Sequence, residues 1–227
     1  MKYTKLFLLF IITVTLAGCS IKEYYFPMAE LVEGKIYTYE CKAEPSNTEF
    51  WKLTSNLTDN TLITEAFNSD YKQYEFFKEQ LNNNGAILLE FISYRSNENE
   101  QNVSAVINKP IDLDVFKWKT DNPYKYSSET IDENYGKVIF EKKREFLEEV
   151  KLTVLEKEHK ALKFKESYKT VVSKTKQKYE YSQFSYYAKG IGLVKMEKEY
   201  PDGAIQVLEL TKILSIPEWE KEKLASN

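Results

Sequence analysis

Short stretches in which apolar and polar residues alternate run along most of this chain. In residues 34–44, GKIYTYECKAE, the side chains at every second position from Tyr37 are aromatic or small, and those between are polar. Residues 49–55 and 61–67 repeat the pattern. Successive side chains of a strand point to opposite faces, so this period of two predicts half-buried β-strands. We therefore predict a strand over each of the three stretches.

The next stretch predicts a hairpin. Residues 71–81 are rich in aromatic side chains, and their pattern fits either a strand or a helix. Asn82-Asn83-Asn84-Gly85 favours a turn, because Asn and Gly tolerate positive φ. Residues 86–94, AILLEFISY, predict a strand covered on both faces. We therefore expect a hairpin over 71–94.

Residues 129–157 permit two interpretations. Their Lys and Glu content is typical of a long helix, whereas several apolar residues are spaced two apart. These residues are Val138, Phe140, Val150, Leu152 and Val154. We favour strands, and we predict two more over 161–172, where Leu162 and Phe164 alternate with lysines, and over the tyrosine-rich 177–188.

Gly190-Ile191-Gly192 invites a comparison with phosphate-binding glycine loops. Such a loop follows a strand and opens a helix whose N-terminus faces the anion. Here the glycines precede Leu193 to Lys198, which has a strand pattern, and Pro201-Asp202-Gly203 then predicts a tight turn before a strand over 204–214. We therefore interpret Gly190 and Gly192 as a bulge or sharp bend between strands.

A short terminal helix is predicted to begin at Ser215 or Ile216. Pro217 suits its first turn, and Glu218 lies near the positive end of its dipole. Trp219 and Leu224 are expected to seal this helix onto the end of the β domain. The elements together predict a mainly β fold with few short helices.

The first residues, MKYTKLFLLFIITVTLAGCS, have the three-part layout of a secretory signal. Lys2 and Lys5 precede an apolar run that is short for a membrane span. Leu16-Ala17-Gly18-Cys19 resembles the bacterial lipobox, which implies cleavage before Cys19 and a diacylglycerol on its sulfur. An ordinary secreted protein or an uncleaved anchor is the alternative. Buried acyl chains contribute about 0.8 kcal/mol per methylene, so the lipid would hold the chain on a membrane.

This leader sets the predicted domain organisation. We expect a lipoprotein signal peptide over 1–18, a tether over 19–32 and a single β-rich domain over 33–227. Ser20, rather than an aspartate, follows the cysteine. In a diderm organism that favours the outer membrane.

Composition argues against several classes of function. The chain has 32 basic and 35 acidic residues, and loss of the signal peptide would remove two lysines, so nucleic-acid binding is not expected. Cys41 is expected to be a buried apolar residue rather than a nucleophile. His159 is the sole histidine and lies in a charged, turn-like stretch, so we expect no zinc site, no serine triad and no cofactor. We therefore predict that the protein is not an enzyme.

The segment Tyr187-Ala188-Lys189-Gly190-Ile191-Gly192-Leu193-Val194-Lys195, followed by a turn and Leu208-Glu209-Leu210, resembles a C-terminal signature of bacterial envelope proteins. These proteins are related to the lipoprotein-localisation factors, and Ile191 replaces their usual valine. The resemblance implies a strongly curved antiparallel sheet or a half-open β-barrel, whose concave side a helix or loop closes. In the localisation factors that cavity holds acyl chains. The resemblance assigns no ligand residue.

Two functions follow. The first is a membrane-anchored module that binds a lipid or another apolar or amphipathic ligand. Aromatic residues at alternating strand positions are its candidate ligand-binding residues, and they are Tyr37, Tyr39, Trp51 and Trp118. The same residues also suit an ordinary core. The second is an envelope assembly or interaction lipoprotein without a small ligand, which would present tyrosines to a protein partner. Those tyrosines are Tyr179, Tyr181, Tyr186 and Tyr187.

Overall fold

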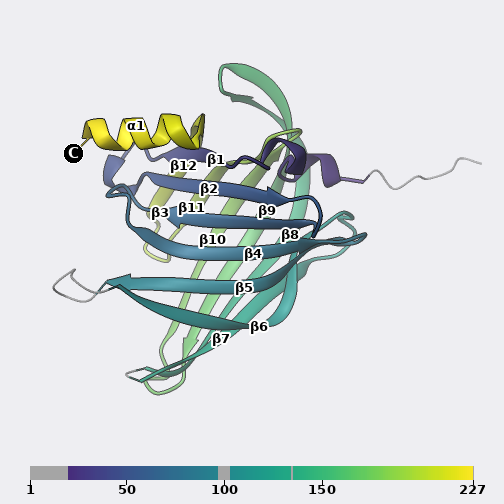
Figure 1. Ribbon diagram of the computed structural model, residues 1–227. Helices are drawn as coiled ribbons and strands as arrows, with labels where there is room; N and C mark the ends of the chain where they lie inside the picture. Colours follow the sequence, from purple (N-terminus) through teal and green to yellow (C-terminus); the bar gives the residue numbers. More distant parts are fainter. Residues whose placement is uncertain (1–19, 97–102, 134, 227) are drawn as a thin grey trace, which may run out of the picture.

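The chain forms a closed antiparallel β-barrel, shown by the computed structural model in Figure 1. The structure describes residues 20–96, 103–133 and 135–226. Each strand pairs with its neighbour in sequence, and β1 pairs with β12 to close the ring. The strands are β1 (Lys35–Glu40), β2 (Glu49–Asn56), β3 (Thr61–Phe67), β4 (Gln73–Leu81), β5 (Gly85–Ser96), β6 (Val103–Lys117), β7 (Tyr124–Asp132), β8 (Gly136–Val154), β9 (Lys157–Val172), β10 (Lys178–Ala188), β11 (Gly192–Glu199) and β12 (Ile205–Ser215).

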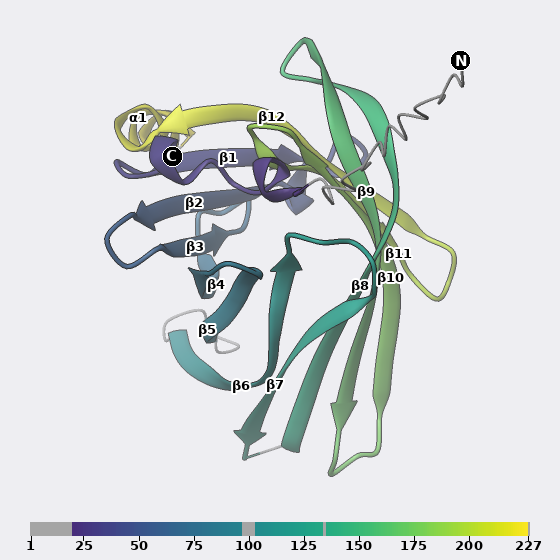
Figure 2. The ribbon, with the colours of Figure 1, turned by 90° about the vertical axis from the view of Figure 1, so that its right-hand side faces the viewer.

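This architecture confirms the predicted fold class, mainly β and strongly curved. The described part of 129–157 forms the end of β7, the whole of β8 and the first residue of β9, so the strands expected there are confirmed and no long helix is present. The expected hairpin of β4 and β5 is also present, with its turn at residues 82–84. Figure 2, a view at right angles, shows β2 to β5 as one wall and β8 to β11 as the wall opposite.

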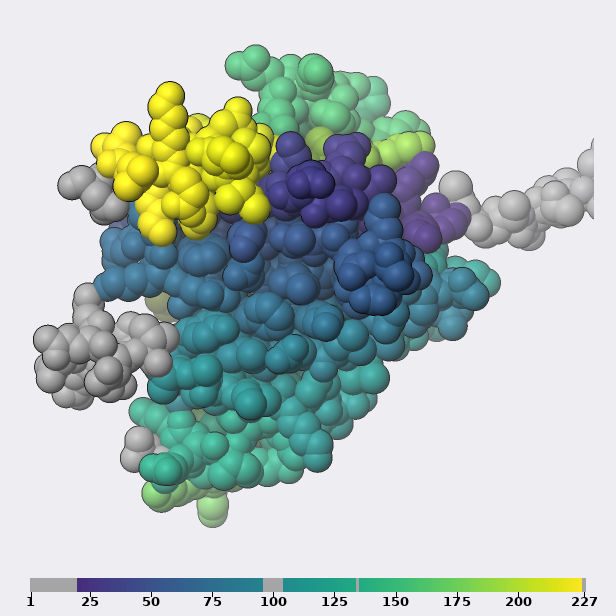
Figure 3. Space-filling model, viewed as in Figure 1, coloured from purple at the N-terminus to yellow at the C-terminus, as the bar shows by residue number. Residues whose placement is uncertain are grey.

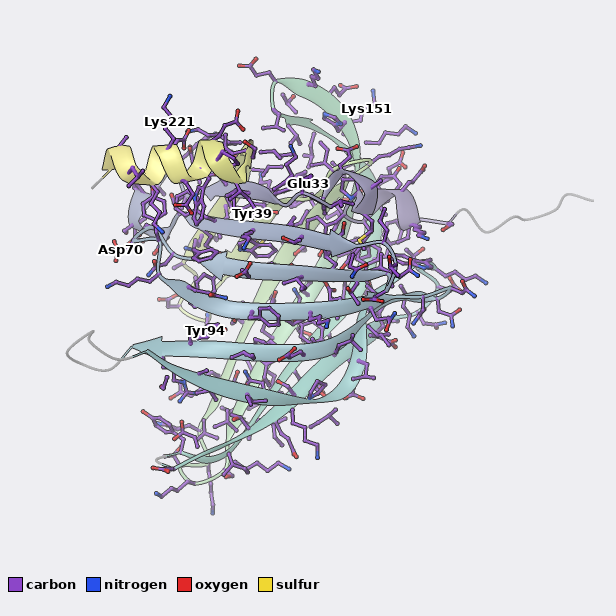
Figure 4. The ribbon with its side chains drawn as sticks, in the orientation of Figure 1. Glu33, Tyr39, Asp70, Tyr94, Lys151 and Lys221 are labelled. Carbon is purple, nitrogen blue, oxygen red and sulfur yellow. The ribbon has the colours of Figure 1, made fainter. Side chains whose placement is uncertain are left out.

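Alternation decides which side chains enter the barrel. Tyr37 and Tyr39 of β1 point inward and are buried, whereas Ile36, the residue before Tyr37, faces the outer side. Figure 4 marks Tyr39 within the barrel and Lys151 near the tip of the β8–β9 hairpin. That hairpin rises beyond the rest of the barrel in both ribbon views.

The segment that precedes β1 closes one end of the barrel. We call residues 20–34 the N-terminal plug. Its Tyr25 and Phe26 are 3% and 7% exposed, and its Leu31 is completely buried. Two of its backbone groups bind the rim, because Ile21 N–H donates to the carbonyl of Trp118 (3.2 Å) and the carbonyl of Glu23 accepts from Gly190 N–H (2.8 Å).

The plug corrects the expected tether over 19–32. From Ser20 onward the structure describes this segment, and its Ile21, Tyr24, Tyr25, Phe26 and Leu31 are buried in the barrel rather than extended in solvent. The physical reason is the apolar surface of these side chains. The segment has neither strand nor helix periodicity, so the pattern of apolar and polar positions does not predict their burial. Cys19 lies outside the described residues.

The terminal helix α1 (Ile216–Ser226) begins where the sequence predicts. Ser215 Oγ donates to Glu218 Oε2 (2.6 Å), and Ser215 N–H donates to the same oxygen (2.7 Å), as in a capping box. The helix lies against the outer wall rather than the barrel end, because Trp219 packs on the outward side chains Ile36 and Phe50. Leu224 is 77% exposed, so it does not contribute to the packing of α1 on the wall. Figure 3 shows α1 next to the plug, above the wall of β2 and β3.

Gly190 lies in the turn from β10 to β11, and Gly192 is the first residue of β11, so a strand rather than a helix follows these glycines. Gly192 has φ of +99°, and a Cβ there would overlap the ring of Phe26. Gly192 is thus required by the plug as well as by the backbone.

We expect Gly192→Ala to lower the free energy of unfolding by about 2–4 kcal/mol. A positive φ costs a non-glycine residue about 1–2 kcal/mol, and overpacking against Phe26 adds about 1–3 kcal/mol. Urea denaturation measures the loss. Gly203→Ala is the matched control, because Gly203 has φ of +85° and no atom lies within 4 Å of the position that a Cβ would take there. Equal losses in the two variants would contradict the contact with Phe26.

Candidate functional site

The interior of the barrel contains a cavity of about 230 Å³. Side chains from strands of both walls and from the plug line it. Its aromatic lining includes Trp51, Phe77, Tyr126, Phe140, Tyr168 and Tyr181. Charged side chains enter the same space, so the cavity is both aromatic and strongly polar.

A buried ion pair stands on the β8–β9 side of the cavity. Arg144 Nε donates to Glu166 Oε1 (2.6 Å), and both residues are almost fully buried, at 3% and 0% exposed. The other arms of the guanidinium donate to the carbonyl of Val115 (2.8 Å) and to the hydroxyl of Tyr187 (2.9 Å). The guanidinium group of Arg144 therefore donates hydrogen bonds to three acceptors, which compensate for the burial of its charge.

Glu166 is the centre of this network. Its Oε2 accepts from Lys142 Nζ (2.9 Å), from Gln183 Nε2 (2.9 Å) and from the hydroxyl of Tyr168 (3.1 Å). Burial alone would raise the pKa of Glu166, but Arg144 and Lys142 outweigh it and hold that pKa at about 2. Glu166 is thus ionised at any physiological pH.

Lys142 faces the cavity beside this network. Its ammonium lies 4.8 Å from the centre of the Tyr168 ring. Burial lowers the pKa of Lys142 to about 8, and Glu166 opposes that shift. The lysine is therefore mostly charged at neutral pH, and Glu166 is its counter-ion.

A second ion pair lies across the cavity, between β2 and β11. Lys198 Nζ is 3.1 Å from Glu49 Oε1. The other oxygen of Glu49 accepts from Trp51 Nε1 (3.0 Å) and from the hydroxyl of Tyr74 (2.8 Å). Glu49 is therefore satisfied by one cation and two aromatic donors.

Two carboxyl groups of β4 differ from that of Glu49, because no cation among the described residues forms an ion pair with them. Glu79 Oε1 accepts from the hydroxyl of Tyr25 in the plug (2.7 Å). Burial raises the pKa of Glu79 to about 7, although Tyr25 and Arg144 oppose the shift. The carboxyl group of Glu75 has no hydrogen bond or ion pair within the described part of the chain, and burial followed by the charge of Glu49 raises its pKa to about 7.

Of the four aromatic residues expected to bind a ligand, Trp51 lines the cavity. Tyr37 and Tyr39 are core residues whose hydroxyls donate to the carbonyls of Ile191 and Leu193 (3.0 Å each). Trp118 packs against Tyr25 at the plugged end and donates to the carbonyl of Asn82 (2.8 Å). These three sit outside the set of residues that line the cavity.

Two of the tyrosines expected to present a binding surface line the cavity instead. Tyr187 is buried there, and Tyr181 stacks on Tyr168 with ring centres 4.3 Å apart. Tyr186 is also buried, but its hydroxyl donates to Glu197 (2.8 Å). Tyr179 is 57% exposed. Cys41 is buried with a free thiol, as expected.

The charged residues of the cavity do not stand out in the pattern of apolar and polar positions. Glu166 follows Leu162 and Phe164 at the next inward position of β9. A carboxylate on an otherwise apolar strand face is the sequence feature that indicates a buried charge here. Arg144 lies between Phe140 and Phe146 in the same way on β8. The pairing of these two residues cannot be predicted from the sequence, because it depends on the register between β8 and β9, which places Arg144 opposite Glu166.

Comparison with known proteins identifies the fold. No protein-family model matches the chain, and no curated protein matches it significantly. Solved structures with the same fold include a candidate lipoprotein of Parabacteroides distasonis, with 15% identity and a TM-score of 0.52 over 86% of this chain and 99% of that one. Another is a candidate exported protein of Bacteroides fragilis with a YmcC-like fold, with 12% identity and a TM-score of 0.53 over 83% of this chain and 98% of that one. The chain thus shares its barrel fold with these proteins.

We expect the free energy of unfolding to fall as the pH rises from 5 to 7.5. Glu75 and Glu79 have pKa values of about 7 in the folded chain against 4.5 as the ordinary value, so the folded state binds more protons in this range. Each carboxyl contributes at most about 1.4 kcal/mol per pH unit. Urea denaturation at several pH values measures the decline.

The double variant Glu75→Gln and Glu79→Gln should show a flatter profile. Glu90→Gln, at an exposed position of β5, is the control and should retain the decline. A decline of the same steepness in the double variant would contradict the assignment to these two carboxyls.

Proposed function

We propose that this chain is a lipid-anchored lipoprotein of the bacterial cell envelope, and that its barrel binds a compact amphipathic ligand without transforming it. The cavity is the observation that carries this proposal. Ligand sites are concave and mostly apolar, with a few polar groups that orient the ligand. The lining of this cavity has such a composition, because aromatic rings form much of it and Glu75 and Lys142 are among its charged groups.

The envelope location is supported by the leader and by the fold. Residues 1–18 have the layout of a secretory signal that ends at Cys19, the residue we propose to be lipidated. The similar solved proteins are described as a candidate lipoprotein and a candidate exported protein. No helix in the described part of the chain has the length and apolar character of a membrane span. Ser20 favours the outer membrane if the organism is diderm.

The size of the cavity limits the ligand. About 230 Å³ is below the usual range of roughly 300–1,000 Å³ for ligand pockets, so a compact molecule fits better than a long acyl chain. The plug covers one end. At the other end, a surface hollow beside the β11–β12 turn includes Tyr168, Tyr181 and Tyr200, and the first two also line the cavity. We place the ligand entrance at this rim.

The proposal is for binding rather than catalysis. Among the described residues that line the cavity, none is a serine, cysteine or histidine that could form a nucleophile–base pair. His159 lies on β9 near the tip of the β8–β9 hairpin, far along the strand from Glu166. In the described ranges, no cluster of His, Cys, Asp and Glu is arranged to hold a metal ion.

A second candidate function, an interaction lipoprotein, has support from the outer wall. Ile107 and Ile111 of β6 are 72% and 51% exposed, and Ile131 of the neighbouring β7 is 77% exposed. Exposed apolar groups on adjacent strands suit a protein partner. A barrel without any ligand would favour this second function.

Lipidation predicts where the protein fractionates in cells. We expect Cys19→Ala to move the protein from the membrane fraction to the soluble fraction and to abolish incorporation of a labelled fatty acid. Cys41→Ala is the matched control, because this buried thiol lies inside the barrel and its loss should leave both readouts unchanged. A Cys19→Ala variant that still carries the label would contradict the assignment.

Filling the cavity should remove the ligand. Ala66 of β3 is 3% exposed and lines the cavity, so Ala66→Phe places a ring where the ligand would sit. We expect native mass spectrometry of the chain from residue 20 onward, purified from its own host, to show a small molecule on the wild type and at least tenfold less on this variant.

Ala225→Phe, at an exposed position of the outer helix α1, is the control and should keep the ligand. Circular dichroism confirms that both variants are folded. A wild-type protein that carries no small molecule, or an Ala66→Phe variant that carries as much as the wild type, would contradict binding in the cavity.

A further inference from the structure

The charges inside the barrel are unevenly satisfied. Among the described residues that line the cavity, the cations are Lys142, Arg144 and Lys198, and each contacts a carboxylate. Two of the acids, Glu75 and Glu79, have no cation as a partner. Because Lys142 and Arg144 share the one carboxylate of Glu166, these three cations and the four acids Glu49, Glu75, Glu79 and Glu166 differ by one carboxyl group. The acids without a cation as partner are Glu75 and Glu79, so a ligand that enters the cavity meets these two carboxyl groups.

Of these two acids, Glu75 is the one whose carboxyl group can pair with a ligand. Glu79 is 3% exposed, and its carboxyl group accepts a hydrogen bond from the hydroxyl of Tyr25 in the plug. Glu75 keeps part of its surface toward the cavity, and its carboxyl group has no bonding partner in the described structure. A carboxylate without a partner in an enclosed cavity is unfavourable unless it is protonated or paired, so the position of Glu75 is unfavourable in the empty barrel.

Aromatic rings surround this carboxyl group. Tyr126 and Tyr181 line the same cavity as Glu75, together with Phe77 and Tyr168. The charged groups that act on Glu75 are Glu49 of β2, Lys142 of β8 and Lys198 of β11. A carboxylate among aromatic faces is the arrangement that recognises ammonium groups, through an ion pair and cation–π attraction.

We propose that the ligand of this cavity carries a positively charged amine, which pairs with the carboxylate of Glu75 while its apolar body packs on the aromatic rings. The inference rests on the proposed binding function and adds the chemical class of the ligand. A carboxylate or phosphate ligand fits less well, because Lys142 and Arg144 are already engaged by Glu166.

Proton linkage follows from the same geometry. The pKa of Glu75 is raised to about 7 in the empty barrel, so part of the population is protonated at neutral pH. An amine binds the ionised form, so binding releases a proton wherever Glu75 is protonated in the free protein. Amine affinity should therefore increase as the pH rises from 6 to 8.

Isothermal titration calorimetry with matched probes tests the charge of the ligand. Phenethylamine, 2-phenylethanol and 3-phenylpropionate have similar size but are cationic, neutral and anionic. The protein is the chain from residue 20 onward, which contains the whole described barrel and plug. We expect phenethylamine to bind at least tenfold more tightly than the other two at pH 7.5, and to bind more weakly at pH 6.

The Glu75→Gln variant isolates the carboxylate. This variant should lose at least tenfold in affinity for phenethylamine, and its affinity for 2-phenylethanol should not change. Glu90→Gln, on the outer wall, should behave as the wild type. Glu75→Asp, which keeps the charge, should retain the preference for the amine and guards against a loss caused by misfolding.

The outcomes separate this inference from the proposed function. Equal binding of the amine and the alcohol, tighter binding of 3-phenylpropionate, or a native ligand without a basic nitrogen would overturn the amine assignment and leave the binding function in place. Failure of all three probes, together with the absence of any co-purified small molecule, would overturn both.

Discussion

Closure of the sheet with twelve strands is the constraint on which the rest of the structure depends. About eight strands make a barrel whose interior its own side chains can fill, and a wider ring leaves more space. This chain fills the excess in two ways. Large aromatic side chains such as Phe116, Phe164 and Tyr187 pack in the core, and the N-terminal plug inserts Tyr25 and Phe26 at one end. The space that remains is the cavity.

The plug, the signature segment and the cavity form one unit. Phe26 packs against the turn at Gly192, and Tyr25 donates to Glu79 inside the cavity. Tyr187, from the same signature segment, contacts both Phe26 and Arg144. Because the plug begins immediately after Cys19, the proposed lipid anchor would hold the plugged end near the membrane and leave the opposite rim accessible to solvent.

The strands could be predicted from the sequence, but the arrangement of the residues around the cavity could not. Alternation in residues 34–44 and 161–172 predicted β1 and β9, because half-buried strands impose a period of two. The plug was missed because its burial depends on a space that exists only after the barrel closes. The partnership of Arg144 with Glu166 depends on register, and the isolation of Glu75 depends on which cations the other acids already engage. Neither property is local in the chain.

A crystal structure of the protein purified from its own host, without added ligand, would show whether the cavity holds a ligand. We expect density for one compact molecule in the cavity, with a polar atom within hydrogen-bond distance of the Glu75 carboxylate and an apolar part against Tyr126 or Tyr181. A cavity that holds ordered water alone, or one into which neighbouring side chains have collapsed, would contradict this expectation.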